Sequence, residues 1–164
     1  DKGITRVGNH GLFMVGSHVA HDCVVGDHVI MANNATIAGH VTLSDRVILG
    51  GLSGVHQFVT VGERAMIGFG SMVSQDVVPY AMVRGERAVV VGLNRVGLRR
   101  SGYASADINQ LANVYQMLFS ADKTNTLRQR VSSCRAQDYD NALIDELLSF
   151  LGRDSKRGML KSNL

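Results

Sequence analysis

Three histidines, two aspartates and a cysteine lie close together in the segment SHVAHDCVVGDHV, residues 17–29. Side chains of this kind bind a metal ion or move a proton, because imidazole is a metal ligand and titrates near neutral pH. His21 and Asp22 are adjacent, so the carboxylate could hold the imidazole in one tautomer and stabilise its protonated form. The pair is therefore a candidate general base. Which other residues lie beside it depends on the secondary structure that contains it.

A repeat of six residues runs through the first half of the chain. Every sixth residue from Val7 to Val73 is large and apolar, and ten of the twelve residues that follow them are Gly, Ala or Ser. A period of six fits neither a helix nor an alternating surface strand. It is typical of a hexapeptide parallel β-helix, a β-solenoid in which three hexapeptides form one triangular coil. The aliphatic residue is expected to face the core, and the small residue to fit where the chain bends.

Stacking of such coils predicts which distant residues become neighbours. Residue i lies beside residue i+18, about 4.8 Å away as in any pair of adjacent strands. His21 then shares a column with Gly39 and Gln57, and Asp22 shares the next column with His40. Gly39 has no side chain to obstruct a substrate, and its backbone N–H could donate to a developing oxyanion. The sequence therefore predicts a base and an oxyanion donor on one wall.

The remaining histidines occupy positions of different kinds. His10 and His28 stand beside Asn9 and Asp27 at turn-like positions, where we expect them to have no chemical role. His56 occupies a small-residue position of the repeat, which is an unfavourable place for an imidazole unless it has a role. We expect His56 to belong to a functional site.

No metal and no other cofactor is expected. Zinc carbonic anhydrases built on related coils carry three histidines in a spacing that this chain does not reproduce. Cys23 and Cys134 are far apart and neither has a CxxC partner, so a structural zinc site is not predicted. Two reduced thiols in a cytoplasmic protein are the expectation.

The hexapeptide pattern predicts coils over residues 1–78. Pro79 follows the last repeats and suits an exit from the coils, because proline cannot donate to a strand ladder. The pattern begins at Val7 without a polar cap, whereas solenoids need capped ends. We therefore expect earlier coils before Asp1.

Residues 79–103 are predicted to form an extended, arginine-rich connector. From residue 84 to residue 100 there are five arginines and one glutamate, a local surplus larger than the +3 net charge of the whole chain. Arginine forms fork-like pairs with phosphate groups. A phosphate-bearing partner is expected, and nucleic acid is not, because no aromatic residues interleave with the arginines.

Residues 104–164 are predicted to form a small α-helical domain. A helical period appears in SADINQLANVYQMLFS, with Ser105 as the expected N-cap, and in TLRQRVSSCRAQD. NALIDELLSFLG predicts a third helix that ends at Gly152. The basic tail RDSKRGMLKSNL, residues 153–164, is expected to be loose. No apolar run approaches the roughly 18 residues of a membrane span, so stable membrane insertion is not expected.

Five stretches of this chain together resemble the UDP-N-acetylglucosamine acyltransferase family. They are HVAHDCVVG (18–26), ANNATIAGHV (32–41), GGLSGVHQF (50–58), QDVVPY (75–80) and GLNRVGLRRSGY (92–103). The resemblance covers essentially the whole chain, helices included. It implies a homotrimer of left-handed β-helices in the cytoplasm, with active sites between subunits, that performs the first step of lipid A biosynthesis. The left hand comes from this resemblance, because the period alone does not reveal it.

The resemblance also implies a reaction and its residues. An (R)-3-hydroxyacyl chain would pass from acyl carrier protein to the glucosamine 3-hydroxyl of UDP-N-acetylglucosamine (UDP-GlcNAc). The resemblance makes His21 the general base, Asp22 its partner and Gly39 the oxyanion donor. The residues it places in the sugar-nucleotide, acyl and phosphate sites are His18, His40, His56, Gln57, Asn94 and Arg100. Phe69 stands where many members have glycine, and is expected to shorten the accepted acyl chain.

Three other interpretations remain open on the sequence. Another hexapeptide acyltransferase, such as the later N-acyltransferase of the same pathway, shares the fold and the donor, although VHQF and the three helices argue against it. A β-helix that serves only as a scaffold would not need the column of His and Asp side chains. An acceptor with a 3-amino group in place of the hydroxyl is also compatible with these residues.

Overall fold

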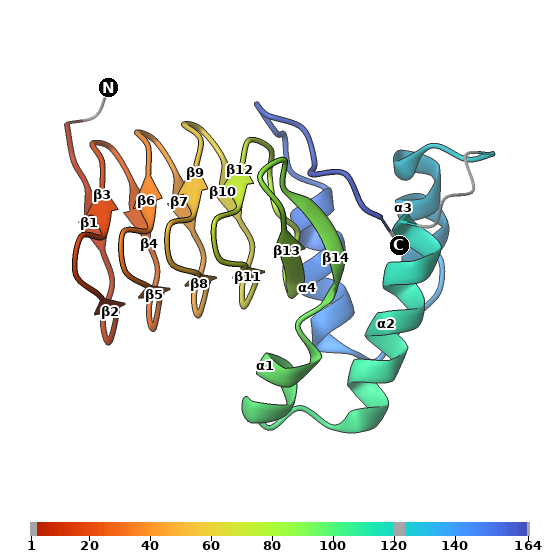
Figure 1. The fold of residues 1–164 in the computed structure, drawn as a ribbon. Helices are drawn as coiled ribbons and strands as arrows, with labels where there is room; N and C mark the ends of the chain where they lie inside the picture. Colours follow the sequence, from red (N-terminus) through yellow and green to blue (C-terminus); the bar gives the residue numbers. More distant parts are fainter. Residues whose placement is uncertain (1–2, 120–123, 164) are drawn as a thin grey trace.

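The computed structural model describes residues 3–119 and 124–163, and its first half is a triangular prism of parallel coils (Figure 1). Short strands form the walls of this prism. Their bounds are β1 (Arg6–Val7), β2 (Leu12–Phe13), β3 (His18–Val19), β4 (Val24–Val25), β5 (Ile30–Met31), β6 (Thr36–Ile37), β7 (Thr42–Leu43), β8 (Ile48–Leu49), β9 (Gly54–Val55), β10 (Thr60–Val61), β11 (Met66–Ile67) and β12 (Met72–Val73). The predicted left-handed parallel β-helix of hexapeptide repeats is confirmed.

Three parallel sheets make the three faces. One contains β1, β4, β7 and β10, the second contains β2, β5, β8 and β11, and the third contains β3, β6, β9 and β12. Each strand from β1 to β9 pairs with the strand 18 residues further along, as Val7 with Val25 and Val19 with Ile37. The predicted column register is therefore correct.

The faces meet at three corners, which we name by one residue each. The His21 corner consists of residues 20–23, 38–41 and 56–59, between the third and first sheets. The Arg64 corner lies between the first and second sheets, and its last turn is residues 62–65, between β10 and β11. The Phe69 corner lies between the second and third sheets, and its last turn is residues 68–71, between β11 and β12.

The aliphatic position of the repeat forms the core of the prism. From Val25 to Val73 these residues are almost completely buried, with at most 4% of their surface exposed. Val7 and Phe13 are 50% and 39% exposed, because no described residue stacks above the first coil. Burial of these side chains stabilises the stack by roughly 1.5–3 kcal/mol for each fully covered residue.

At the corners of the coils, residues other than glycine adopt the left-handed backbone conformation, with positive φ. At the His21 corner these residues are Asp22, His40 and Phe58, with φ of 58°, 62° and 65°. Such a conformation costs roughly 1–2 kcal/mol for a residue other than glycine. The left-handed residue recurs every 18 residues at this corner, so successive coils turn at the same place and their columns stay aligned.

The prism continues briefly after the repeat ends. Val77 bridges to Val61, and β13 (Ala81–Arg84) pairs in parallel with β11. β14 (Val89–Leu93) then returns antiparallel to β13, and the short helix α1 (Arg95–Arg100) follows it. The segment 79–103 thus contains two strands and a helical turn, and the division of the chain into three domains remains a prediction.

Three longer helices complete the fold, as the sequence predicts. They are α2 (Ser105–Phe119), α3 (Leu127–Arg135) and α4 (Ala142–Leu151), which ends at Gly152. The prediction that Ser105 caps the first of them is wrong by one residue, because Ser105 is already helical and the Ala104 carbonyl accepts the Ile108 N–H. None of the described helices has both the length and the apolar character that crossing a membrane requires.

The C-terminal tail is attached to the prism, so the expectation of a loose tail is wrong. Met159 forms a β-bridge with Asp76, and Ser162 forms one with Val90. The Asp76 backbone N–H donates to the Gly158 carbonyl, and the Asp76 carbonyl accepts the Leu160 N–H. The tail binds there because the last coil and β14 present backbone groups that still need hydrogen-bond partners.

Candidate active site

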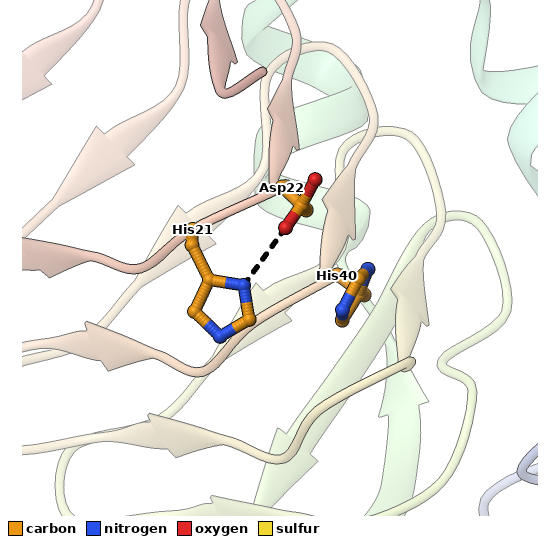
Figure 2. A group of neighbouring side chains, drawn as sticks. All are labelled: His21, Asp22 and His40. Atoms are coloured by element: carbon orange, nitrogen blue, oxygen red, sulfur yellow. Dashed lines mark hydrogen bonds and ion pairs between the residues drawn. The ribbon is translucent and has the colours of Figure 1, made fainter. Parts of the chain in front are cut away.

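His21 and Asp22 form a hydrogen-bonded pair at the His21 corner (Figure 2). The distance from His21 Nδ1 to Asp22 Oδ2 is 2.9 Å, and the imidazole is 68% exposed whereas the carboxylate side chain is only 5% exposed. The other carboxylate oxygen accepts the Gly3 N–H at 2.7 Å. Because a carboxylate accepts, Nδ1 carries the proton and Nε2 is left as the basic nitrogen.

Gly39 lies directly beneath the imidazole of His21, as the column register predicts. A Cβ on Gly39 would come within 2.6 Å of both Nε2 and Cε1 of His21. Gly39 is buried, and no acceptor for its N–H is found among the residues that the structure describes. A buried N–H without a partner is rare, and it is available to a ligand oxygen next to the basic nitrogen.

His40 and Phe58 continue the column of Asp22 along the prism. The His40 ring meets the His21 ring edge-on, with centroids 5.2 Å apart, and stacks on Phe58 at 4.6 Å. The ammonium group of Lys156, from the C-terminal tail, lies 5.2 Å from the centre of the Phe58 ring. The corner is therefore a packed row of rings that ends in a positive charge.

One ligand atom each from His21, Asp22 and His40 lies within 4.8 Å of the others (Figure 2). Two imidazoles and a carboxylate are a set of ligands that zinc accepts. The hydrogen bond from His21 Nδ1 already occupies an oxygen of Asp22, so a metal would compete with the pair. The expectation that the protein needs no metal or cofactor remains a prediction.

Grooves border the His21 corner on both sides. A groove of about 600 Å³ on the first face is lined by polar side chains that include Asp22, His40 and Asp76. A groove of about 440 Å³ on the third face is lined by His18 and His56 among mostly apolar or small residues such as Met72. The pair of His21 and Asp22 therefore stands between a polar groove and an apolar one.

The structure brings together only some of the predicted site residues within one chain. His21, Asp22, Gly39 and His40 share the corner, and Gln57 is the next residue of the Gly39 column. His18, whose strand β3 leads into this corner, and His56, which belongs to it, line the apolar groove. His10 and His28, which were expected to have no role, stack on each other at another corner, 4.9 Å apart.

Asn94, Arg100 and Phe69 lie away from the His21 corner. Asn94 is 4% exposed; its amide oxygen accepts the Gly97 N–H to cap α1, and its amide nitrogen donates to the carbonyl of Arg64. Arg100 is exposed at the end of α1. Phe69 is 75% exposed at the Phe69 corner. A single chain does not place any of these three beside His21.

Sequence reasoning missed Arg157. Its terminal Nη2 lies 2.5 Å from Nδ1 of His56, a residue 101 positions earlier. The only signal in the sequence was the positive charge of the tail, which does not show where the tail binds. Cys23 and Cys134 are both free thiols and buried.

The coils and the helical region define a hexapeptide-repeat protein with a left-handed parallel β-helix. A family model described as UDP-N-acetylglucosamine O-acyltransferase, domain 2, matches residues 76–160, which is more than half of the chain. The chain belongs to this family.

Similar proteins carry the same description. Acyl-[acyl-carrier-protein]–UDP-N-acetylglucosamine O-acyltransferase of Caulobacter vibrioides is 47% identical over 95% of this chain and 59% of its own length. The protein of the same name in Myxococcus xanthus is 43% identical over 97% of this chain and 60% of its own length. The chain thus spans about three fifths of the curated relatives it matches.

Solved structures agree with this assignment. UDP-N-acetylglucosamine O-acyltransferase from Moraxella catarrhalis superposes with a TM-score of 0.92 at 38% identity, over 98% of this chain and 62% of that one. The Arabidopsis UDP-N-acetylglucosamine acyltransferase has a TM-score of 0.90 at 38% identity, over 94% of this chain and 56% of that one. Both comparisons cover the helices as well as the coils.

Proposed function

We infer that this chain carries the catalytic pair of an enzyme that transfers an (R)-3-hydroxyacyl group from acyl carrier protein to the glucosamine 3-hydroxyl of UDP-GlcNAc, the first step of lipid A biosynthesis. The names of the relatives support the donor and the acceptor. The contact of His21 with Asp22, directly above Gly39, is the observation that carries the proposal.

His21 acts as the general base. A sugar hydroxyl is a poor nucleophile until its proton is removed, and Nε2 accepts that proton as the oxygen attacks the thioester carbonyl. Asp22 holds the proton on Nδ1 and stabilises the imidazolium that forms. The tetrahedral intermediate then expels the thiol of the carrier's prosthetic arm, which takes the proton back from His21, and the ester is released.

Gly39 stabilises the charge that develops on the carbonyl oxygen. Its buried N–H has no competing acceptor among the described residues, so it can donate to the oxyanion without first losing another hydrogen bond. No covalent intermediate on the protein is needed. The only free thiol near the pair, that of Cys23, is buried, and burial raises its pKa.

Some of the remaining predicted residues act from neighbouring subunits of a homotrimer. His21 and Phe69 lie at different corners of the prism, and Arg100 lies at the end of α1, so one copy cannot assemble them. When prisms associate side by side, the His21 corner of one copy faces another corner of the next. The substrate would then be bound beside His21 by His18, His40, His56 and Gln57. Asn94, which also caps α1, and Arg100 would contact its phosphates.

A matched pair of substitutions tests the role of His21. His21→Asn should lower the initial rate of O-acylation of UDP-GlcNAc by roughly 10²–10⁴-fold, the usual contribution of a positioned base. His28→Asn is the control, since His28 lies at another corner and asparagine tolerates its φ of 57°. Equal rates for the two variants would contradict the proposal.

The assay also separates the competing interpretations. Product made only from a 3-O-acylated glucosamine acceptor would identify the later N-acyltransferase. Preference for an acceptor with a 3-amino group would change the acceptor and leave the mechanism intact. A protein that binds neither acyl carrier protein nor a nucleotide sugar would be a scaffold.

A further inference from the structure

We propose that Arg157 is a positioning residue that fixes the tautomer of His56 and thereby turns its Nε2–H toward an oxygen acceptor of the substrate. The position of Arg157 in the C-terminal tail makes the tail a part of the site. The tautomer assignment depends only on the geometry of the chain. The statement about substrate rests on the proposed function.

Two partners of opposite character compete for Nδ1 of His56. Arg157 Nη2 lies 2.5 Å from this nitrogen, and the carbonyl oxygen of Gln57 lies 3.3 Å from it. A guanidinium group only donates, whereas a carbonyl oxygen only accepts. The shorter contact requires that Nδ1 carries no proton, so the proton resides on Nε2.

His56 therefore presents a hydrogen-bond donor to a ligand. No partner of its Nε2 is found in the part of the chain that the structure describes. The ring is exposed and lines the apolar groove together with His18 and Met72. A fixed N–H in such a groove recognises a carbonyl, hydroxyl or phosphate oxygen, and the other tautomer would present a lone pair instead.

The backbone of the tail holds Arg157 in place. Ser155 Oγ accepts the N–H groups of Arg157 and Gly158, which shapes a tight turn there. The hydrogen bonds of Asp76 with Gly158 and Leu160 then attach this turn to the end of the prism. Arg157 is half-buried, so its guanidinium has less freedom than an arginine on an open surface.

The first experiment reads the tautomer directly. Histidine labelled with ¹⁵N shows separate shifts for a protonated and an unprotonated ring nitrogen, and His56→Gln assigns the signals. In the unsubstituted protein Nδ1 of His56 should be unprotonated. In Arg157→Met the two shifts should exchange, because the Gln57 carbonyl then becomes the partner of Nδ1.

Two further variants control for folding and for the loss of charge. Arg157→Lys keeps a donor on the tail and should restore the original shifts. Arg128→Met removes an exposed arginine from α3 and should leave the shifts and the activity unchanged. A protonated Nδ1 in the unsubstituted protein, or equal shifts in Arg157→Met, would overturn the proposal.

The second experiment tests the effect on the reaction. Arg157→Met should raise KM for the substrate about tenfold with little change in kcat, because a binding contact is lost. In a His56→Gln background, Arg157→Met should not raise KM further, since both substitutions remove the same contact. Exchanged shifts in a protein that does not acylate UDP-GlcNAc would uphold the role of Arg157 and reject the proposed reaction.

Discussion

The imidazole of His21 covers Gly39 so closely that a single methyl group on Gly39 would displace it. The position of that Cβ is 2.6 Å from Nε2, well inside van der Waals contact. The basic nitrogen and the candidate oxyanion donor thus occupy one small space. This proximity makes the proposed mechanism sensitive to the smallest change of side chain.

Gly39→Ala should strongly reduce the rate of acyl transfer and hardly change stability. The exposed imidazole can move away from the methyl group, so the fold tolerates it, but His21 then loses its alignment with Asp22 and with the Gly39 N–H. A misplaced base and oxyanion donor together cost about 10²-fold or more in kcat. Steady-state kinetics and a thermal melt measure the two effects, and an unimpaired rate would place the reaction elsewhere.

Mixed oligomers of two inactive variants should recover activity. His21→Asn removes the base at one corner, and Arg100→Gln removes the exposed guanidinium at the end of α1. If adjacent copies contribute these residues to one site, hybrids contain some sites with both intact. The test is to unfold and refold the variants together and compare the rate with that of separately refolded variants. Absence of recovery, with hybrids verified by native mass spectrometry, would argue against shared sites.

Phe69→Gly should shift the preferred donor toward longer acyl chains. The Phe69 ring is exposed and lies against Gly51 on the neighbouring coil, so removing the ring opens space at this corner. Each additional buried CH₂ contributes roughly 0.8 kcal/mol to binding. Competition between hydroxyacyl donors of different length measures the preference. An unchanged preference would show that Phe69 does not bound the acyl site.

Zinc should inhibit the enzyme, and a chelator should leave its activity unchanged. A metal bound by His21, Asp22 and His40 would use the imidazole lone pairs and the carboxylate that the proposed proton transfer requires. Initial rates with added Zn²⁺ or EDTA test both statements. His40→Asn should weaken the inhibition by zinc. Loss of activity in EDTA would instead reveal a required metal.

The protein should lose stability steeply at high pH. Burial raises the pKa of Tyr115 well above its ordinary value, and burial also raises the pKa of Tyr80. Both therefore stay neutral in the folded state, while the unfolded chain loses these protons above about pH 10. The stabilisation from keeping these two hydroxyls neutral is complete below that pH. It is lost as the pH rises toward the folded-state pKa, by up to about 1.4 kcal/mol of unfolding free energy per pH unit for each tyrosine.

Tyr115→Phe isolates this effect. At neutral pH it should cost about 1 kcal/mol, because the hydrogen bond from the Tyr115 hydroxyl to the Pro79 carbonyl is lost. Above about pH 10 it should lose stability less steeply than the unsubstituted protein. Urea unfolding at several pH values measures both quantities, and equal slopes would contradict the assignment.

The sequence predicted the coils and the centre of the site because both follow from one period. Once every sixth residue faces the core, the 18-residue register follows, and His21 must lie beside Gly39. The three helices were also predictable, because each has an apolar stripe. Thr126, which caps α3, and Asn141, which caps α4, are typical residues for helix starts.

The contacts of the tail could not be predicted in this way. Arg157 meets His56 through backbone hydrogen bonds of Asp76 with the tail, and no repeat or helical period encodes that pairing. The use of Asn94 as a helix cap was also hidden, because it depends on where α1 begins beside the Arg64 carbonyl. Such contacts depend on which backbone groups remain unpaired after the regular elements have formed.

The 18-residue register also determines how far the tail stands from the pair of His21 and Asp22. Removing residues 45–62 would preserve the alternation of faces and corners, since the next coil has the same phase. The tail would then approach His21 by one strand spacing, about 4.8 Å. Lys156 and Arg157 would contact His40 and Ala38 in place of Phe58 and His56. Insertions or deletions of whole coils would thus change the length of the grooves beside His21 in fixed increments, without altering His21, Asp22 or Gly39, the residues proposed to perform the chemistry.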